Sequence, residues 1–310
     1  MFKGAHTKNR IAKSTTTLLQ LGLSLGRGII LAGIMFVILS PIFSIISDAV
    51  MNEIDVFNPL VFMIPENFTL ENFRLAFRHL NYVSTLTTTL TLSLSAMVLQ
   101  VLLCSLTGYG FARFDFPGKN ILFGVVILSI VVPVQSYMVS LFTQFRFFGI
   151  FGWETNLLNT FFPVLIMSAL GVGLRSGLFI YIFRQFFKGL PKDLEEAALI
   201  DGAGWLRTYV GIMLPNAASA IITVSVFSFV WQYNDTFYAA MFMQQLSLLP
   251  VRLTALPGFL SHAGVHIGNS ALIGLVVSAA ILLAIAPVVT LYFGIQRFFM
   301  EGVERSGIVG

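Results

Sequence analysis

The sequence predicts an all-α integral membrane protein with six transmembrane helices. The composition is the first indication, because 56% of the 310 residues are hydrophobic and only 10% are charged. Soluble domains carry about 25% charged residues, so the apolar surplus must face lipid. The second indication is a set of six apolar stretches, each near the roughly 20 residues that a crossing needs. Backbone amides in lipid must be bonded within their own segment, which favours helices.

The six expected crossings follow one another along the chain. They lie at 28–47, within 79–112, within 120–145, within 155–183, within 208–234, and within 253–296 from about Ser270. The first stretch is longer than the 7–15 residues of a signal-peptide core, and no A-x-A cleavage site follows it. We therefore interpret it as an uncleaved helix. Residues 1–27 form a basic tail, and residues 28–310 form the membrane domain.

The distribution of Lys and Arg predicts the orientation of these helices. With the N-terminus inside, few of the 18 Lys and Arg residues fall in external loops. These are Arg74, Arg78, Arg146 and Arg252. Arg175 falls within the fourth crossing, and the others are cytoplasmic. Cytoplasmic loops carry the excess of positive charge, so both termini and the tail 1–27 are expected in the cytoplasm.

Several classes of function are disfavoured by the same residues. The single cysteine, Cys104, permits no disulfide and no Cys/His metal site, so no bound metal is expected. The basic residues lie in short patches between apolar runs, which does not indicate nucleic-acid binding. Neither paired carboxylates nor an activated nucleophile occurs at membrane depth, so the chain is not expected to be an enzyme. An ion-coupled secondary transporter remains the alternative, although no Asp or Glu lies within an expected crossing.

The cytoplasmic segment 189–215, between the fourth and fifth crossings, contains a short helix of its own. Pro191 or Asp193 can open it, and Gly202 can end it in a left-handed conformation. Its first turn is acidic, as the helix dipole favours, with Asp193, Glu195 and Glu196. Its small apolar face consists of Leu194, Ala197, Ala198 and Leu199. These residues leave two interpretations open, a helix on the inner leaflet or a knob that docks on a soluble partner.

Motifs in this segment resemble those of a known family. Glu196-Ala197-Ala198, followed by Gly202 and by Ile212-x-Leu214-Pro215, resembles the EAA loop of bacterial ABC importer permeases. Further stretches resemble the MalG-like, carbohydrate-type members of that family. They are Phe68–Phe73, Tyr109–Gly118, Arg184–Phe187, Trp231–Asp235, and Gln296–Phe299 with Gly302. The order and membrane depth of these motifs make the resemblance specific.

The resemblance implies an ABC type I importer fold for a bacterial inner-membrane subunit that imports sugars or oligosaccharides. The short helix would be the coupling helix that docks on an ATPase. Its docking residues would be Glu195, Glu196, Ala197, Ala198, Asp201, Gly202 and Ala203. The implied partners are a second homologous permease, two ATP-binding subunits, an extracellular solute-binding protein and the bilayer. The chain contains no G-x-x-x-x-G-K-[ST] motif, so ATP and Mg²⁺ are expected on the partner ATPase, with no cofactor here.

Three residues are candidates for the solute pathway. Arg175 is the one clear charge deep in an expected crossing, and such charges usually face a cavity or a partner. A contact that fixes helix packing is the alternative role for Arg175. Gln135 follows Pro133 in the third crossing, where a kink is expected. Asn234 ends the fifth crossing on the outside.

Overall fold

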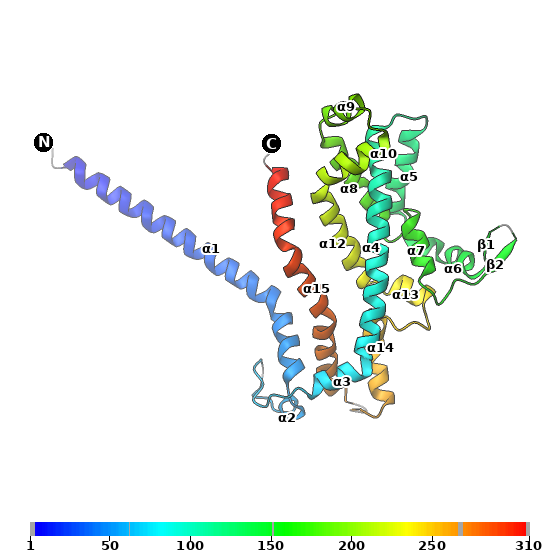
Figure 1. Ribbon diagram of the computed structural model, residues 1–310. Helices are drawn as coiled ribbons and strands as arrows, with labels where there is room; N and C mark the ends of the chain where they lie inside the picture. Colours follow the sequence, from blue (N-terminus) through cyan, green and yellow to red (C-terminus); the bar gives the residue numbers. More distant parts are fainter. Residues whose placement is uncertain (1–3, 62, 151, 266–268, 308–310) are drawn as a thin grey trace. The chain divides into compact units, whose positions relative to one another are not determined.

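The structure, a computed structural model, describes residues 4–61, 63–150, 152–265 and 269–307, and most of them are helical (Figure 1). The chain divides into two compact units. The first contains residues 1–74 and 269–282, and the second contains residues 75–268 and 283–310. The helices α3 (Glu71–Leu80) and α15 (Ser270–Gly307) each begin in the first unit and end in the second.

The first unit carries a long apolar helix followed by a polar segment. Helix α1 spans Gly4–Val50, and α2 spans Glu53–Val56. The amide of Asn72 donates to the carbonyl oxygens of Ala49 and Met51, at 3.2 and 2.8 Å. Thr69 Oγ1 accepts from the Glu71 backbone N–H at 3.1 Å and so caps the start of α3.

A buried carboxylate, that of Asp55, is hydrogen-bonded within the polar segment that follows α1. Asp55 accepts hydrogen bonds from the backbone and the side chain of Asn67, at 2.8 and 2.7 Å. These two bonds lower the pKa of the Asp55 carboxyl. The ionised carboxylate therefore stabilises this turn of the chain.

The second unit is built around one long helix. Helix α4 spans Tyr82–Arg113 and packs against α7 (Phe162–Ala169), α8 (Ser176–Gly189) and α12 (Ala218–Tyr233). Helix α5 (Lys119–Val131) covers α8. The turn before α5 has Gly118 at φ 80°, a conformation that glycine adopts without steric cost.

The remaining elements of the second unit are short. They are η1 (Val134–Tyr137), α6 (Met138–Arg146), β1 (Phe148–Ile150), β2 (Trp153–Thr155), α9 (Asp193–Ile200), α10 (Trp205–Thr208), η2 (Tyr209–Met213), α11 (Leu214–Asn216), α13 (Phe237–Phe242) and α14 (Leu249–His262). The strands β1 and β2 form an antiparallel hairpin that the sequence did not predict. Within this unit, α9 and α10 lie at the same end as the end of α4 and the start of α5 (Figure 1).

Two glycines permit the closest helix contacts of the second unit. A Cβ at Gly108 in α4 would lie 2.6 Å from the Phe183 Cβ and 2.9 Å from the Arg184 backbone nitrogen in α8. A Cβ at Gly177 in α8 would lie 2.9 Å from the Val126 carbonyl oxygen in α5. Both glycines therefore allow neighbouring helices to approach closely.

Helices long and apolar enough to cross a membrane occur at three of the expected places. They are Leu23–Val50, Tyr82–Arg113 and Ser270–Gln296. The third and fifth expected crossings are bent pairs instead. Lys119–Val131 and Val134–Arg146 meet at 101°, and Trp205–Asn216 and Ala218–Tyr233 meet at 78°. The described residues thus provide three to five candidate spans.

The prediction of six simple helices is wrong for the fourth segment. Residues 170–175 separate α7 from α8 and are not helical. Gly171 and Arg175 have positive φ values of 71° and 59°, which a right-handed helix does not accommodate. The bend in the third expected crossing lies at Val132 and Pro133, between α5 and η1. Proline lacks the backbone N–H that would continue the helical hydrogen bonds.

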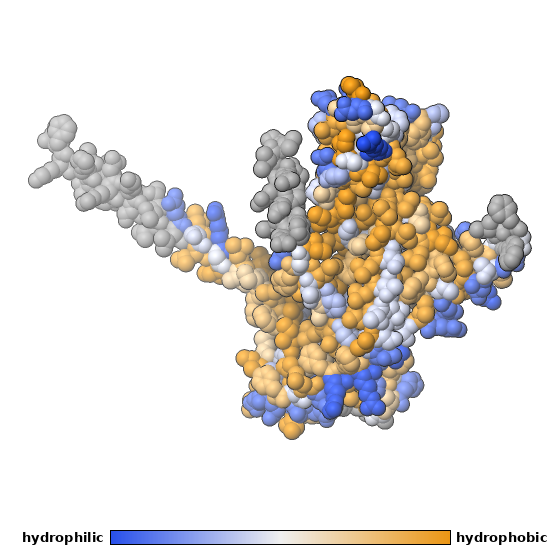
Figure 2. Space-filling model, viewed as in Figure 1, coloured by the Kyte–Doolittle hydropathy of each residue, from blue (hydrophilic) through white to orange (hydrophobic). Residues whose placement is uncertain are grey.

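The surface of the second unit agrees with a membrane location. In Figure 2 hydrophobic residues cover most of its middle, and hydrophilic residues gather near α9 and at the opposite end. Large apolar side chains on α5 are exposed, with Ile121 at 75% and Val131 at 73%. Such a broad apolar surface would be unfavourable in water and suits a lipid-facing helix.

Candidate functional site

Helix α9 lies between two turns that fix its length. It begins at Asp193, and the Lys192 carbonyl accepts from the backbone N–H groups of Glu195 and Glu196 at 2.9 and 3.1 Å. At its other end Gly202 has φ 79°, and the Ala203 N–H donates to the Ala198 carbonyl at 2.9 Å. The left-handed glycine ends the helix, as the sequence predicts.

The two faces of α9 have different surroundings. Glu195 and Ala198 are buried, at 7% and 4% exposure. Glu196, Ala197 and Ile200 lie on the opposite, exposed face, and Ile200 is 85% exposed. An apolar side chain left this open at the end of a membrane subunit is available for a partner surface.

A buried ion pair attaches the inner face of α9 to α4. Glu195 Oε2 lies 3.2 Å from Nε of Arg113, and both side chains are less than 10% exposed. Arg113 is the last residue of α4, and its Nη2 also donates to the Leu190 carbonyl at 2.7 Å. A displacement of α9 would therefore be transmitted to the end of α4, because separating two buried charges is unfavourable.

The sequence prediction missed this ion pair. It grouped Glu195 and Ala198 with the residues that dock on a partner, and the structure instead turns both side chains toward this chain. The exposed members of the predicted set are Glu196, Ala197, Asp201 and Gly202, with Ala203 half-buried. The helical period was the signal that could have separated them, because positions 195 and 198 share one face and positions 193, 196, 197 and 200 share the other.

Aromatic side chains form the base on which this end of the unit is packed. The Tyr109 ring lies 5.5 Å from Phe187 and 5.1 Å from Tyr209, between ring centroids. The Tyr209 hydroxyl shares a hydrogen bond of 2.7 Å with Ser105. The rings of Phe114 and Trp205 meet edge to face at 5.0 Å. These contacts make the support of α9 a packed core, since aromatic pairs add to the burial of apolar area.

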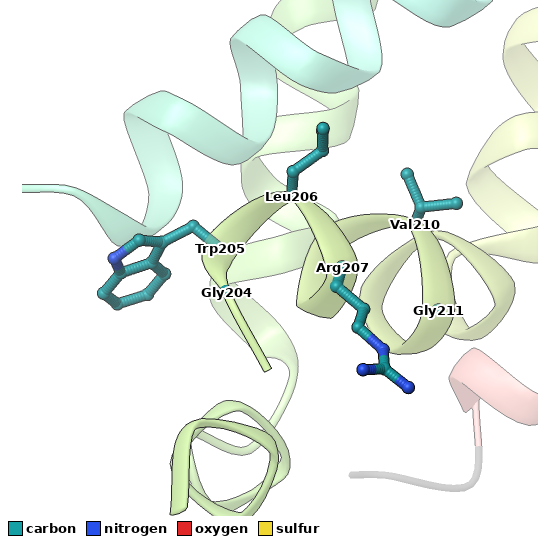
Figure 3. A pocket seen from close by; sticks show the side chains of 6 residues that line it. All are labelled: Gly204, Trp205, Leu206, Arg207, Val210 and Gly211. Carbon is teal, nitrogen blue, oxygen red and sulfur yellow. The ribbon is translucent and has the colours of Figure 1, made fainter. Parts of the chain in front are cut away.

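An open hollow of about 640 Å³ lies in the segment that follows α9 (Figure 3). Its lining comes from α10, η2 and the residue before them, namely Gly204, Trp205, Leu206, Arg207, Val210 and Gly211. In Figure 3 the side chains of Leu206 and Val210 point to one side of the helix, and Arg207 points to another. Leu206 is 70% exposed. The surface beside the end of α9 is thus apolar, with one cation.

A second region of interest is the break between α7 and α8. Gln100 of α4 is 1% exposed, and its Nε2 donates to the Leu174 carbonyl at 2.8 Å and contacts Ser176 Oγ at 3.0 Å. Its Oε1 accepts from Ser228 of α12. One buried amide therefore holds the broken segment between two helices and satisfies a carbonyl that has no helical partner.

Removing this amide is expected to destabilise the second unit. In Gln100→Leu the Leu174 carbonyl and the Ser228 hydroxyl lose their partner, and each buried unsatisfied group costs about 1–3 kcal/mol. We expect a Tm lowered by several degrees in detergent-solubilised protein. The control is Gln185→Leu, because Gln185 is exposed and bonds only to Tyr181 and Arg184 on its own helix. An unchanged Tm in Gln100→Leu would contradict the assigned role.

The structure does not bring the three predicted pathway residues into direct contact. Arg175 is exposed, and its guanidinium carbon lies 5.6 Å from the centre of the Trp231 ring. Gln135 is exposed in η1, and the Asn234 amide donates to the Val230 carbonyl of its own helix at 2.8 Å. No hydrogen bond joins any two of these three described residues. Arg175 is therefore the member of the set with a defined neighbour from another element.

Asp235, next to Asn234, has a structural role. Its carboxylate accepts from the backbone N–H groups of Tyr238 and Ala239 at the start of α13, at 3.4 and 3.2 Å. Burial raises the pKa of Asp235, and these backbone donors oppose the rise. Within the described part of the chain, no three His, Cys, Asp or Glu side chains gather as a metal site.

The described residues thus form a helical protein with apolar candidate spans, two of them bent, and a charged helix exposed at one end. Residues 100–305 match the family described as binding-protein-dependent transport system inner membrane component. The chain is 31% identical to the osmoprotective compounds uptake permease protein GgtD of Synechocystis over 226 residues, 71% of this chain and 68% of the relative. It is 30% identical to the diacetylchitobiose uptake system permease protein NgcG of Streptomyces coelicolor over 255 residues, 79% and 76% of the two chains.

The fold also matches a solved structure. The crystal structure of a bacterial ABC transporter involved in the import of the acidic polysaccharide alginate matches with a TM-score of 0.75 and 21% identity, over 89% of this chain and 96% of that one. The chain belongs to the family of binding-protein-dependent transport system inner membrane components. It is therefore an inner-membrane permease subunit of an ABC importer and is not itself the catalytic subunit.

Proposed function

We propose that this chain is one half of the membrane pathway of a carbohydrate importer and that α9 is its coupling helix. The observation that carries the proposal is the division of α9 into two faces. Its inner face is fixed to α4 through Glu195 and Arg113, and its outer face presents Glu196, Ala197 and Ile200. A helix built in this way can receive force from a partner and pass it to a membrane helix.

The proposed assembly has two permease halves, two ATP-binding subunits on the cytoplasmic side and an extracellular solute-binding protein. ATP and Mg²⁺ belong to the ATP-binding subunits. Each bent pair, and the pair α7 and α8, would form one crossing, which gives six crossings with both termini inside. The excess of Lys and Arg on the side of α9 supports this orientation. The tail 1–27 would then be cytoplasmic, and residues 28–310 would form the permease domain.

A carbohydrate is the solute class that the relatives support. NgcG is named for diacetylchitobiose, a sugar. The motifs Trp231–Asp235 and Tyr109–Gly118 resemble carbohydrate-type permeases in the same way. Uptake assays with labelled mono- and oligosaccharides, in cells that contain the complete importer, test this solute class directly.

The outer face of α9 is tested by reversing one charge. Glu196→Lys is expected to reduce uptake at least tenfold and to reduce co-purification of the ATPase, because Glu196 is exposed on the proposed docking face. The amount of permease in the membrane should not change, since the Glu196 side chain is exposed. Uptake and subunit ratios are the measurements.

The matched control is Asp115→Lys, an exposed acid in the turn before α5 that pairs only with Lys119 at 3.1 Å. Exposed ion pairs contribute little, so this variant should transport normally. The docking role of Glu196 is wrong if Glu196→Lys supports the same uptake as Asp115→Lys.

A further inference from the structure

The break between α7 and α8 places irregular backbone deep in the second unit. The Leu174 carbonyl is bonded to Gln100, which precedes Arg113 by roughly 20 Å along α4 at 1.5 Å per residue. A hydrocarbon core is about 30 Å thick, so the break lies at mid-membrane depth. Irregular backbone at that depth occurs where it is buried in protein or lines a water-filled cavity. Leu170 and Val172 are 71% and 64% exposed, so the break is not covered by this chain.

Arg175 carries an unneutralised charge at this position. It adopts a left-handed conformation, with φ 59°, that is unfavourable for a residue with a side chain. Its side chain is exposed, and it takes part in none of the ion pairs of the described residues. A free guanidinium at membrane depth is strongly unfavourable unless it faces water and an opposite charge arrives there. The fold thus maintains both a strained backbone and an unpaired cation at the same residue.

The neighbours of Arg175 orient the guanidinium without neutralising it. The group lies over the Trp231 ring, which is itself stacked on Phe179 and Phe227 at 5.7 and 5.4 Å. A ring face attracts a cation and leaves its N–H donors free.

The nearby acid does not pair with Arg175 either. The carboxylate of Asp235 accepts from the backbone N–H groups of Tyr238 and Ala239, and it forms none of the ion pairs of the described residues. Among the described residues, the guanidinium of Arg175 therefore lies beside an aromatic ring and has no carboxylate as an ion-pair partner. The five donors of the guanidinium remain available for a ligand.

We propose that Arg175 is a specificity-determining residue that binds an acidic group, a carboxylate or a phosphate, on the carbohydrate passing through this subunit. The inference rests on the proposed function and narrows its solute class to acidic sugars. A guanidinium binds carboxylate and phosphate through two parallel hydrogen bonds, which a lysine cannot reproduce. Trp231 holds the guanidinium in place and is a positioning residue.

The test is uptake into proteoliposomes that contain the complete importer and its binding protein. Three probes are compared, namely a neutral disaccharide, its uronic acid counterpart and its phosphorylated counterpart. The wild-type protein is expected to import at least one acidic probe better than the neutral one. Arg175→Gln should reduce acidic uptake at least tenfold, mainly through KM, and reduce neutral uptake by a much smaller factor, so that the ratio of acidic to neutral uptake falls. Acidic uptake by Arg175→Lys should lie between that of the wild type and that of Arg175→Gln. The lysine keeps the positive charge but lacks the paired N–H donors of the guanidinium.

The two acidic probes separate a uronate from a sugar phosphate as the group that is bound. An equal loss of neutral and acidic uptake in an assembled Arg175→Gln importer would overturn the proposal, because it indicates a packing role or a contact with the second permease. A wild-type importer that takes up the neutral probe and excludes both acidic ones would overturn it without any variant. Uptake of no carbohydrate at all would contradict the proposed function itself, which is a distinguishable result.

Discussion

Reversing the charge of Glu195 is expected to abolish transport. In Glu195→Arg two cations, Arg113 and the new residue, would face each other in a site where the native side chains are less than 10% exposed. Removing one partner of a buried ion pair costs about 3–5 kcal/mol, and a like-charge pair is worse. We expect α9 to separate from the end of α4, so that the importer hydrolyses ATP without uptake or fails to assemble. Uptake and ATP hydrolysis by the purified complex are the measurements.

A double variant with the two charges exchanged distinguishes the loss of this ion pair from a general loss of folding. Glu195→Arg combined with Arg113→Glu restores opposite charges at the same two positions and is expected to recover a substantial part of uptake. The control pair is Glu71 and Arg74, which lie 3.6 Å apart with side chains 54% and 82% exposed. Glu71→Arg should leave transport unchanged, since an exposed pair contributes at most about 1 kcal/mol. Normal uptake by Glu195→Arg alone would show that α9 is not fixed through this pair.

Placing a large side chain at Gly108 is expected to prevent stable folding of the second unit. A Cβ there would lie 2.9 Å from the backbone nitrogen of Arg184, which cannot move away without moving α8. Overpacking typically costs about 1–3 kcal/mol, and a leucine adds atoms beyond the Cβ. Gly108→Leu should therefore lower the yield of monodisperse protein in detergent and lower its Tm by more than ten degrees.

Gly110 provides the matched control on the same helix. A Cβ at Gly110 has no neighbour within 4 Å, so Gly110→Leu changes composition in the same way without a clash. We expect Gly110→Leu to match the wild type in yield and Tm, both measured by size-exclusion chromatography and thermal unfolding. Equal behaviour of the two variants would mean that α4 and α8 do not approach as closely as Gly108 indicates.

The helical membrane class and the position of α9 were accessible from the sequence because both depend on local patterns. Apolar length decides where a helix can cross a membrane, and the helices Tyr82–Arg113 and Ser270–Gln296 coincide with two expected stretches to within one residue at their C-terminal ends. The acids at the start of α9 and the glycine at its end are contacts within one or two turns. Such signals do not depend on how the chain packs elsewhere.

The bends and the buried pair were not accessible because they depend on tertiary contacts. The segment that breaks at 170–175 is apolar enough to read as one helix, and its irregular backbone is stabilised by Gln100, more than seventy residues earlier in the chain. The pairing of Glu195 with Arg113 likewise joins distant positions. Asp193, Glu195 and Glu196 all lie in the first turn of α9, where the helix dipole stabilises any acid. No local signal therefore distinguishes Glu195 as the acid that is buried against α4.

If α9 is the coupling helix, the ATPase covers its outer face in the assembled importer. Cys104 is the single cysteine and is buried, so Ala197→Cys in a Cys104→Ser background gives one reactive thiol on the exposed face. The most direct measurement is the rate at which a soluble maleimide labels this thiol, in the isolated permease and in the assembled importer. We expect labelling at least tenfold slower after assembly with the ATPase. Equal rates in the two states would contradict that role of α9.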